Sequence, residues 1–400
     1  MAVTSTQQRP EAQPRSVTIL GSTGSVGCNT VDLIDRQPEA FSVEALTGNR
    51  NVAVLVEQAR RLRPRFAVVG DPGSYRDLKD GLEGTGIEVA AGHDALVEAA
   101  SLPADWVGAG IVGAAGLEPT LAAIHRGAVV GLANKECLVC AGDLMVREIA
   151  RCGATVVPVD SEHSAVFQVF DFDNADKVES IILTASGGPF RTLDRETMAS
   201  MTPAQAVAHP NWDMGAKISV DSATMMNKGL EIIEAYHLFP VEKDQIEVVV
   251  HPQSVIHSMV AYVDGSVLAQ MGTPDMRTPI AYALSWPRRM AAPAPKLKLT
   301  EIGDLTFEAP DPERFPALRL ARDALTRGGT APTILNAANE IAVQSFLNGR
   351  IRFLDIADVV EKTLDLTPHG QLESISNVLQ ADGAARDTAT SIVSRYPALD

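Results

Sequence analysis

Short apolar runs alternate with amphipathic stretches along the first 160 residues of the chain. The runs are rich in valine, isoleucine and leucine, and the stretches between them carry apolar residues at helical spacing. Such alternation predicts a parallel sheet covered by helices on both faces. Residues 16–159 are therefore expected to form a Rossmann-like, doubly wound α/β domain. The expected strands are 16–20, 41–46, 66–69, 106–112, 128–133 and 155–159, and the clearest helices are 28–36 and 52–62.

The pattern changes after about residue 160. Apolar runs continue, and the pair Asp264-Gly265 between two of them is typical of a hairpin turn. A hairpin adds an antiparallel component, so residues 160–290 are expected to form an α+β domain. The expected strands of this domain are 178–184, 245–250, 257–263 and 266–270.

The last part of the chain is expected to be helical. Prolines between 287 and 295 predict a semi-rigid connection, which we place at residues 291–311. Apolar positions then recur at helical spacing and predict a helical domain over residues 312–398. Because Gly383 interrupts the final stretch, that stretch is either one helix or two.

Composition narrows the class of protein. The 400 residues include 34 basic and 50 acidic side chains, which give a net charge of −16 and a pI near 5.0. This balance argues against a protein that binds nucleic acid or an anionic membrane, because both need a basic surface. Apolar residues at 46% and charged residues at 21% exclude a disordered chain.

No apolar run approaches the roughly 18 residues of a membrane span. Residues 1–15 lack the apolar core of a secretory signal and are expected to be a disordered tail. Four cysteines in a chain of this length make no disulfide scaffold and fit a reducing, cytoplasmic setting. Cys137 and Cys140 have the spacing of a redox pair, but no second pair completes a zinc site. We expect both to be buried as small hydrophobic residues.

The sequence GSTGSVG at residues 21–27 lies between the first expected strand and the first expected helix. Backbone N–H groups at such a turn, together with the helix dipole, can hold a pyrophosphate. The spacing GxxGxxG differs from the common GxGxxG, so the motif gains weight from its place in the first βαβ unit. A tight turn that binds nothing is the alternative.

The end of the second expected strand bears on the choice of cofactor. An NAD site would carry an acidic residue there for the ribose 2′-hydroxyl, whereas this chain has Asn49, Arg50 and Asn51. A guanidinium flanked by amides suits a 2′-phosphate, which favours NADP. A loop arginine that faces only solvent is the alternative.

Asp160 and Glu162 lie two residues apart where a strand is expected to end, and this spacing points both side chains to one face. Two such carboxylates repel unless a cation or a shared proton lies between them. A third acid brought in by folding would complete an all-oxygen site that suits Mg²⁺ or Mn²⁺. Two solvated carboxylates explain the sequence alone equally well.

Polar groups collect in the middle of the chain. Segment 219–231 brings together hydroxyls, an amide and an ammonium, which suit a phosphate. Segments 186–189 and 209–215 are loop-like in composition. Trp212 in the second of these is either a core residue or an aromatic flap over a ligand.

Seven motifs together resemble one enzyme family, the 1-deoxy-D-xylulose 5-phosphate reductoisomerases. The resemblance runs from about residue 16 to residue 396, and the 23-residue segment HPNWDMGAKISVDSATMMNKGLE (209–231) is highly specific. The other motifs are GSTGSVG (21–27), ANKE (133–136), PVDSEH (158–163), ASGGPF (185–190), HPQSVIHS (251–258) and LNAANE (335–340).

The resemblance implies an NADPH-dependent homodimer of the non-mevalonate isoprenoid pathway. Such an enzyme converts 1-deoxy-D-xylulose 5-phosphate to 2-C-methyl-D-erythritol 4-phosphate. Residues 160–290 would then be the catalytic, metal- and substrate-binding and dimerisation domain. The metal would be Mn²⁺ or Mg²⁺, with Co²⁺ as an alternative, and its ligands would be Asp160, Glu162 and Glu231.

The resemblance also implies roles for individual residues, with Lys135 and the three metal ligands as the catalytic group. NADPH would contact Thr23, Gly24, Ser25, Val26, Asn49, Arg50, Asn51, Asn134, Glu136 and Gly215. Substrate would contact Lys135, Ser161, Glu162, Ser186, His209, Trp212, Ser222, Asn227, Lys228 and Glu231, with His257 nearby as a supporting polar group.

Two other functions stay open on the residues alone. One is a metal-independent oxidoreductase of another Rossmann family, such as a semialdehyde or homoserine dehydrogenase. The other is a catalytically silent NADP-binding sensor that dimerises through its helical end. Metal-dependent turnover would exclude the first function, and NADPH oxidation in the presence of substrate would exclude the second.

Overall fold

The computed structural model describes residues 14–208, 212 and 215–397. The chain divides into two compact units. The first unit contains the chain up to Cys137 together with residues 145–167 and 275–295, and the second contains residues 138–144, 168–274 and the chain from Lys296 onward. Residues 160–167 and 275–290 thus fall in the first unit.

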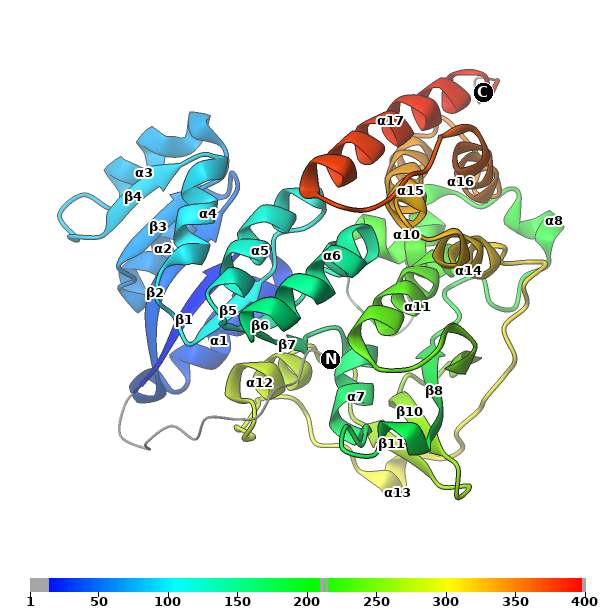
Figure 1. Ribbon diagram of the computed structural model, residues 1–400, viewed down its shortest axis with the longest axis horizontal. Helices are drawn as coiled ribbons and strands as arrows, with labels where there is room; N and C mark the ends of the chain where they lie inside the picture. Colours follow the sequence, from blue (N-terminus) through cyan, green and yellow to red (C-terminus); the bar gives the residue numbers. More distant parts are fainter. Residues whose placement is uncertain (1–13, 209–211, 213–214, 398–400) are drawn as a thin grey trace. The chain divides into compact units, whose positions relative to one another are not determined.

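The first unit is built on a seven-stranded sheet in the order β4-β3-β2-β1-β5-β6-β7 (Figure 1). All neighbouring strands are parallel. Strands β3, β5 and β7 are buried along their whole length, as expected where helices cover both faces. The predicted doubly wound fold is confirmed, with β4 as a strand that the pattern did not indicate. The strands are β1 (Arg15–Leu20), β2 (Phe41–Gly48), β3 (Phe66–Val69), β4 (Glu88–Ala91), β5 (Trp106–Ala109), β6 (Val129–Leu132) and β7 (Thr155–Pro158).

Helices connect these strands and cover the sheet. Helix α1 packs on β1 and on α12, α2 packs on β2 and β3, and α4 and α5 pack on each other and on further strands. The strand order reverses between β1 and β5, so the loops that follow these strands open a crevice at their carboxyl ends. The helices are α1 (Ser25–Asp35), α2 (Val52–Leu62), α3 (Tyr75–Gly81), α4 (His93–Ser101), α5 (Leu117–His125), α6 (Glu136–Cys152) and α12 (Arg277–Ser285).

Strand β1 begins at Arg15, one residue earlier than expected. Arg15 was predicted to be the last residue of the disordered tail. The Arg15 guanidinium donates hydrogen bonds to the carbonyls of Leu284 and Trp286, at 2.7 and 3.0 Å. These contacts hold the start of the strand to the end of α12. The rest of the predicted tail, residues 1–13, lies outside the described residues.

The second unit contains a mixed four-stranded sheet in the order β11-β10-β8-β9. Strands β8 and β9 are parallel, and the two remaining pairs are antiparallel. The predicted hairpin at Asp264-Gly265 joins β10 to β11, and the Gly265 N–H donates to the Tyr262 carbonyl at 2.9 Å. The α+β expectation is therefore confirmed. The strands are β8 (Val178–Ala185), β9 (Ile246–Val250), β10 (Ile256–Tyr262) and β11 (Val267–Met271).

Helices make up the rest of the second unit, and α7 crosses from the first unit into it. Helices α14 to α17 pack on one another, and α11 packs on α14. The final segment is one helix that continues through Gly383, because Val378, Ala385 and Ala389 are buried where α17 meets α15 and α16. Helix α7 (Ser161–Val169) lies in the first unit up to Phe167. The helices of the second unit are α8 (Arg195–Met198), α9 (Pro203–Val207), α10 (Ala216–Thr224), α11 (Met226–Leu238), α13 (Leu299–Ile302), α14 (Ala317–Arg327), α15 (Ala331–Leu347), α16 (Asp355–Leu366) and α17 (Ile375–Ser394).

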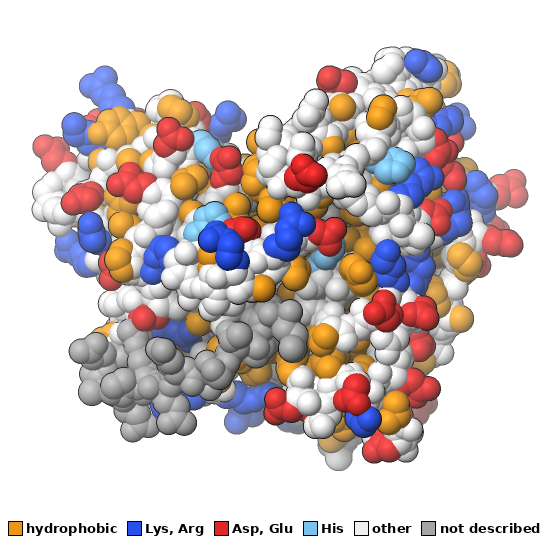
Figure 2. All heavy atoms as spheres, in the orientation of Figure 1, with side chains coloured by type: hydrophobic (Ala, Val, Ile, Leu, Met, Phe, Trp, Pro, Cys, Tyr) orange, Lys and Arg blue, Asp and Glu red, His pale blue; other side chains and the backbone are white. Residues whose placement is uncertain are grey.

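The surface carries charged side chains of both signs. On the face drawn in Figure 2, acidic and basic side chains are interspersed. Cys137 and Cys140 are both buried, which confirms their predicted place in the core. Within the described residues, no helix combines the length and the apolar character needed to cross a membrane.

Candidate active site

The glycine-rich loop joins β1 to α1 in the first unit. Gly21 has a φ of +79°, and a Cβ at this position would lie 2.6 Å from the Gly110 carbonyl oxygen. A Cβ on Gly27 would lie 2.3 Å from the Gly21 carbonyl oxygen, so the loop packs closely against the start of α1. The first turn of α1 carries no acidic side chain that would compete with an anion for its N–H groups. The loop therefore suits a phosphate. Thr23 and Gly24 belong to the loop, and Ser25 and Val26 open the helix.

The polar loop after β2 carries Asn49, Arg50 and Asn51. Asn51 caps α2, because its side-chain oxygen accepts a hydrogen bond from the Val54 N–H at 3.4 Å. The Arg50 side chain is 81% exposed, and its Nε lies 3.0 Å from Oδ2 of Asp71, which follows β3. Arg50 is thus partly oriented by a carboxylate and open to a ligand. Nothing in the sequence indicated Asp71.

Asn134, Lys135 and Glu136 follow β6 and are all buried. The Asn134 side-chain amide donates hydrogen bonds to the carbonyls of Ile111 and Gly113, at 2.5 and 3.0 Å. These two bonds fix the orientation of the amide beside the loop that follows β5. Lys135 Nζ donates to Asp160 Oδ2 at 2.7 Å, so a buried ion pair links the ends of β6 and β7.

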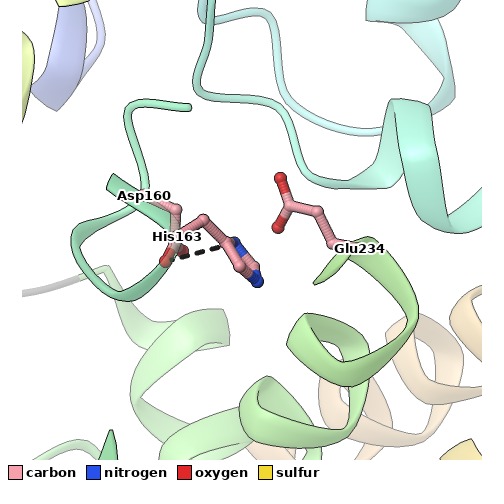
Figure 3. A group of neighbouring side chains, drawn as sticks. All are labelled: Asp160, His163 and Glu234. Carbon is pink, nitrogen blue, oxygen red and sulfur yellow. Dashed lines mark ion pairs between the residues drawn. The ribbon is translucent and has the colours of Figure 1, made fainter. Parts of the chain in front are cut away.

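Asp160 and Glu162 do not lie on a strand, and the argument from strand alternation was wrong. Strand β7 ends at Pro158, and Ser161 begins α7. The two carboxylates are nevertheless coupled, because Asp160 Oδ1 accepts a hydrogen bond from the Glu162 N–H at 3.1 Å and so holds the first turn of the helix. The Ser161 hydroxyl donates to the Glu162 carboxylate. His163 is fully buried, with its Nδ1 3.6 Å from Asp160 Oδ1 (Figure 3).

Glu231 lies on α11 of the second unit and has no exposed surface. Both of its oxygens accept hydrogen bonds from the preceding turn, one from the Asn227 amide and one from the Lys228 ammonium. Lys228 is itself buried, so the pair is a buried ion pair. Glu234, also drawn in Figure 3, is a second buried carboxylate on α11.

Ser186 follows β8 and accepts a hydrogen bond from the Gly188 N–H at 3.2 Å. Gly188 has a φ of +68°, and a Cβ there would lie 2.6 Å from the Ser222 carbonyl oxygen, so this loop rests on α10. Ser222 lies near the end of α10, and Met225 alone separates α10 from α11. The structure therefore brings together the elements that carry Ser186, Ser222, Asn227 and Lys228.

The expected flap is described only in part. His209 lies outside the described residues. Trp212 is half-buried, and its ring centroid is 6.1 Å from that of His257 on β10. Gly215 is the N-cap residue of α10.

The parallel sheet with its glycine loop, the basic loop after β2 and the buried acidic residues define a class of protein, the dinucleotide-binding oxidoreductases of the α/β type. Sequence comparison is more specific. Residues 17–142 match the family described as 1-deoxy-D-xylulose 5-phosphate reductoisomerase, residues 156–239 match its C-terminal domain, and residues 271–388 match the DXP reductoisomerase C-terminal domain. The chain belongs to the 1-deoxy-D-xylulose 5-phosphate reductoisomerase family.

Individual relatives agree with this placement. The 1-deoxy-D-xylulose 5-phosphate reductoisomerase of Rhodospirillum centenum is 66% identical over 379 residues, which are 95% of this chain and 94% of that protein. The solved structure of the Zymomonas mobilis enzyme in complex with NADPH is 54% identical, with a TM-score of 0.92 over 96% of this chain and 100% of that one. A DOX-P reductoisomerase solved with NADPH, fosmidomycin and magnesium is 42% identical, with a TM-score of 0.89 over 95% and 98%.

The structure adds residues that the sequence did not select. Asp71, His163 and Glu234 lie beside or near predicted site residues, and no local pattern distinguishes them from other polar residues. Lys217 and Asp221 are different, because their i,i+4 spacing on α10 is a recognisable ion-pair pattern. That pattern would have indicated the ion pair, though not that the Asp221 side chain is buried.

Proposed function

We propose that this chain converts 1-deoxy-D-xylulose 5-phosphate to 2-C-methyl-D-erythritol 4-phosphate in the non-mevalonate isoprenoid pathway, with NADPH and a divalent cation. Membership of the reductoisomerase family supports the reaction. The observation that carries the proposal is the buried pair of Lys135 and Asp160 at the carboxyl ends of β6 and β7. Open α/β sheets bind their ligands at this end, and the pair is partly exposed there, where a ligand can reach it.

The residues of the first unit fit NADPH. Asn134 is almost fully buried, and its Oδ1 has no hydrogen-bond partner among the described residues. A buried acceptor of this kind calls for a donor, and the carboxamide of a nicotinamide offers one. The glycine loop would hold the pyrophosphate, and Arg50 with Asn49 and Asn51 would hold the adenosine end. The remaining predicted contacts, Thr23, Gly24, Ser25, Val26, Glu136 and Gly215, are proposed on the family resemblance.

The acidic residues fit a hard divalent cation. Its proposed ligands are Asp160, Glu162 and Glu231, an all-oxygen set of the kind that Mg²⁺ or Mn²⁺ prefers, with Co²⁺ as an alternative. Each unit supplies an ammonium to its own carboxylate, Lys135 to Asp160 and Lys228 to Glu231. These pairs place a positive charge beside two of the three carboxylates.

When bound, the cation polarises the substrate oxygens and NADPH supplies the hydride. The side chains of this protein would bind and orient the substrate. Lys135 and Ser161 would contact its carbon skeleton, and Glu162 and Glu231 would orient it. Trp212, with His209, would cover the substrate and exclude water. The phosphate end would be bound by Ser186, Ser222, Asn227 and Lys228.

The deciding experiment is NADPH oxidation with 1-deoxy-D-xylulose 5-phosphate, monitored through the loss of NADPH absorbance. We expect turnover with Mn²⁺ or Mg²⁺, its loss after chelation, and its return when the metal is added back. Turnover that survives chelation would favour a metal-independent dehydrogenase. A protein that binds NADPH but never oxidises it with substrate and metal present would favour a sensor.

Replacing Arg50 by alanine is expected to lower the preference for NADPH over NADH by about tenfold, the effect of losing one hydrogen bond to a charged group. The measurement is kcat/KM for each cofactor. Arg36→Ala is the matched control, because Arg36 is another exposed arginine with a single carboxylate partner, Asp32, at 3.0 Å. A similar loss of preference in both variants would refute the assignment of Arg50.

A homodimer in the cytoplasm completes the proposal. The family resemblance supports the dimer, and so does the edge of the four-stranded sheet, where β11 carries the exposed apolar residues Val267 and Leu268. Four free cysteines support a reducing compartment.

A further inference from the structure

Helix α10 is the element on which the proposed phosphate-binding residues are assembled. Ser222 lies on it, and the loop with Ser186 rests on it through Gly188. Helix α11, with Asn227 and Lys228, follows after a single residue, Met225, whose φ of +64° turns the chain sharply. A shift of α10 would therefore move all four phosphate contacts together.

Helix α10 is also held by a buried carboxylate. Asp221 is 1% exposed, and its Oδ1 accepts a hydrogen bond at 2.8 Å from the side-chain amide of Asn339, a residue of α15 with no exposed surface. Its Oδ2 lies 2.8 Å from Lys217 Nζ, one turn earlier on α10. A buried carboxylate needs such partners, and these two lie on different elements. The amide ties α10 to the C-terminal helices, and the ammonium ties it to its own first turn.

The contact lies next to a proposed phosphate-binding residue in the sequence. Asp221 directly precedes Ser222, so the side chain that anchors the helix is next to one that would bind phosphate. Asn339 belongs to the LNAANE motif, which the proposed function leaves without a task. Helix α15 of the C-terminal region is therefore hydrogen-bonded to the residue that precedes Ser222.

We propose that Asn339 and Asp221 are positioning residues for the phosphate end of the substrate. The Asn339 amide fixes the Asp221 carboxylate, the carboxylate fixes α10, and α10 sets Ser222 and the Ser186 loop at their places. This inference rests on the proposed function, because it assigns the same four residues to the phosphate. It goes further by giving the C-terminal helices a part in substrate affinity.

Asn336 provides a matched control on the same helix. It is as buried as Asn339, and its amide donates to Glu340 Oε1 at 3.1 Å. Glu340 in turn pairs with Arg386 on α17, at 2.5 Å. Removal of either asparagine amide therefore disturbs a buried polar contact of α15, but only that of Asn339 reaches α10.

The test compares Asn339→Leu with Asn336→Leu. For Asn339→Leu we expect the KM for 1-deoxy-D-xylulose 5-phosphate and the inhibition constant of inorganic phosphate to rise together by about tenfold, the size of one lost hydrogen bond to a charged group. The kcat and the NADPH affinity should change less than about threefold. Asn336→Leu should leave KM and phosphate inhibition near the wild-type values. Asn339→Ser, a smaller polar change, serves if Asn339→Leu does not fold.

A double-mutant cycle with Asp221→Ala, which removes the acceptor, tests the contact itself. If the two side chains act through one hydrogen bond, the combined variant Asp221→Ala/Asn339→Leu should have a KM no higher than that of the single variant with the higher KM. Equal rises in KM for the Asn336 and Asn339 variants, or an unchanged phosphate inhibition constant in Asn339→Leu, would overturn the inference. A wild-type protein that does not turn the substrate over would instead overturn the proposed function, and the two failures are distinguishable.

Discussion

Replacing Glu231 by glutamine is expected to lower kcat/KM for 1-deoxy-D-xylulose 5-phosphate by about a thousandfold or more, the scale of losing a principal electrostatic contact in the transition state. The glutamine keeps the shape of Glu231, and its oxygen can still accept a hydrogen bond from Asn227 or Lys228. It carries no charge for a cation. Three measurements check the prediction: steady-state kinetics, calorimetric titration with Mn²⁺, and NADPH binding, of which only the last should match the wild type.

Glu234→Gln is the informative comparison, because Glu234 is also buried and lies on the same helix. We expect this variant to keep its Mn²⁺ affinity. The opposite pattern, in which Glu234→Gln loses Mn²⁺ and Glu231→Gln does not, would move the ligand from Glu231 to Glu234. Loss of the fold or of NADPH affinity in Glu231→Gln would also contradict the assignment.

The first unit was predictable because its strands are buried on both faces. A strand such as Phe66–Val69 is a continuous apolar run, and helices of about three turns separate these runs. Strand β4 escaped the same reasoning, because its four residues, Glu88–Ala91, are exposed or only half-buried and give no apolar run. Edge strands with one weakly covered face therefore show the weakest apolar pattern in the sequence.

Two local features depended on contacts that periodicity does not record. The start of α7 at Ser161 is fixed by Asp160, whose carboxylate binds the Glu162 N–H. At Gly383 the cost of a helical glycine is only about 1 kcal/mol, which the burial of neighbouring α17 residues against α15 outweighs. A local hydrogen bond decided the first outcome, and tertiary packing decided the second.

At the candidate site, too, the sequence predicts contacts within one helix but not contacts between distant segments. Asn227, Lys228 and Glu231 are within one helical turn, so their mutual contacts follow from the sequence once a helix is assumed. The contact of Asp221 with Asn339 joins residues 118 positions apart, and nothing local in either segment indicates it. Family resemblance supplied the choice of Glu231 among many acids, which elementary chemistry could not make.

Replacing Lys228 by methionine is expected to weaken both substrate binding and the metal-free fold. Glu231 would then be a fully buried carboxylate that has lost its ammonium, and breaking a buried pair costs about 3–5 kcal/mol of the free energy of unfolding. The KM for 1-deoxy-D-xylulose 5-phosphate should rise by about a hundredfold, because a buried, charge-assisted contact to the phosphate is lost. Chemical denaturation without metal and steady-state kinetics measure the two effects.

A divalent cation at Glu231 would replace the missing positive charge, so Mn²⁺ should stabilise Lys228→Met more than it stabilises the wild type. This difference separates a cation site from a merely structural ion pair, which metal would not restore. Lys362→Met is the matched control, because Lys362 pairs with Asp358 at 2.6 Å on the exposed side of helix α16. An exposed pair contributes little, so that variant should keep its stability, its KM and its response to Mn²⁺. Equal stabilisation of all three proteins by Mn²⁺ would place the cation away from Glu231.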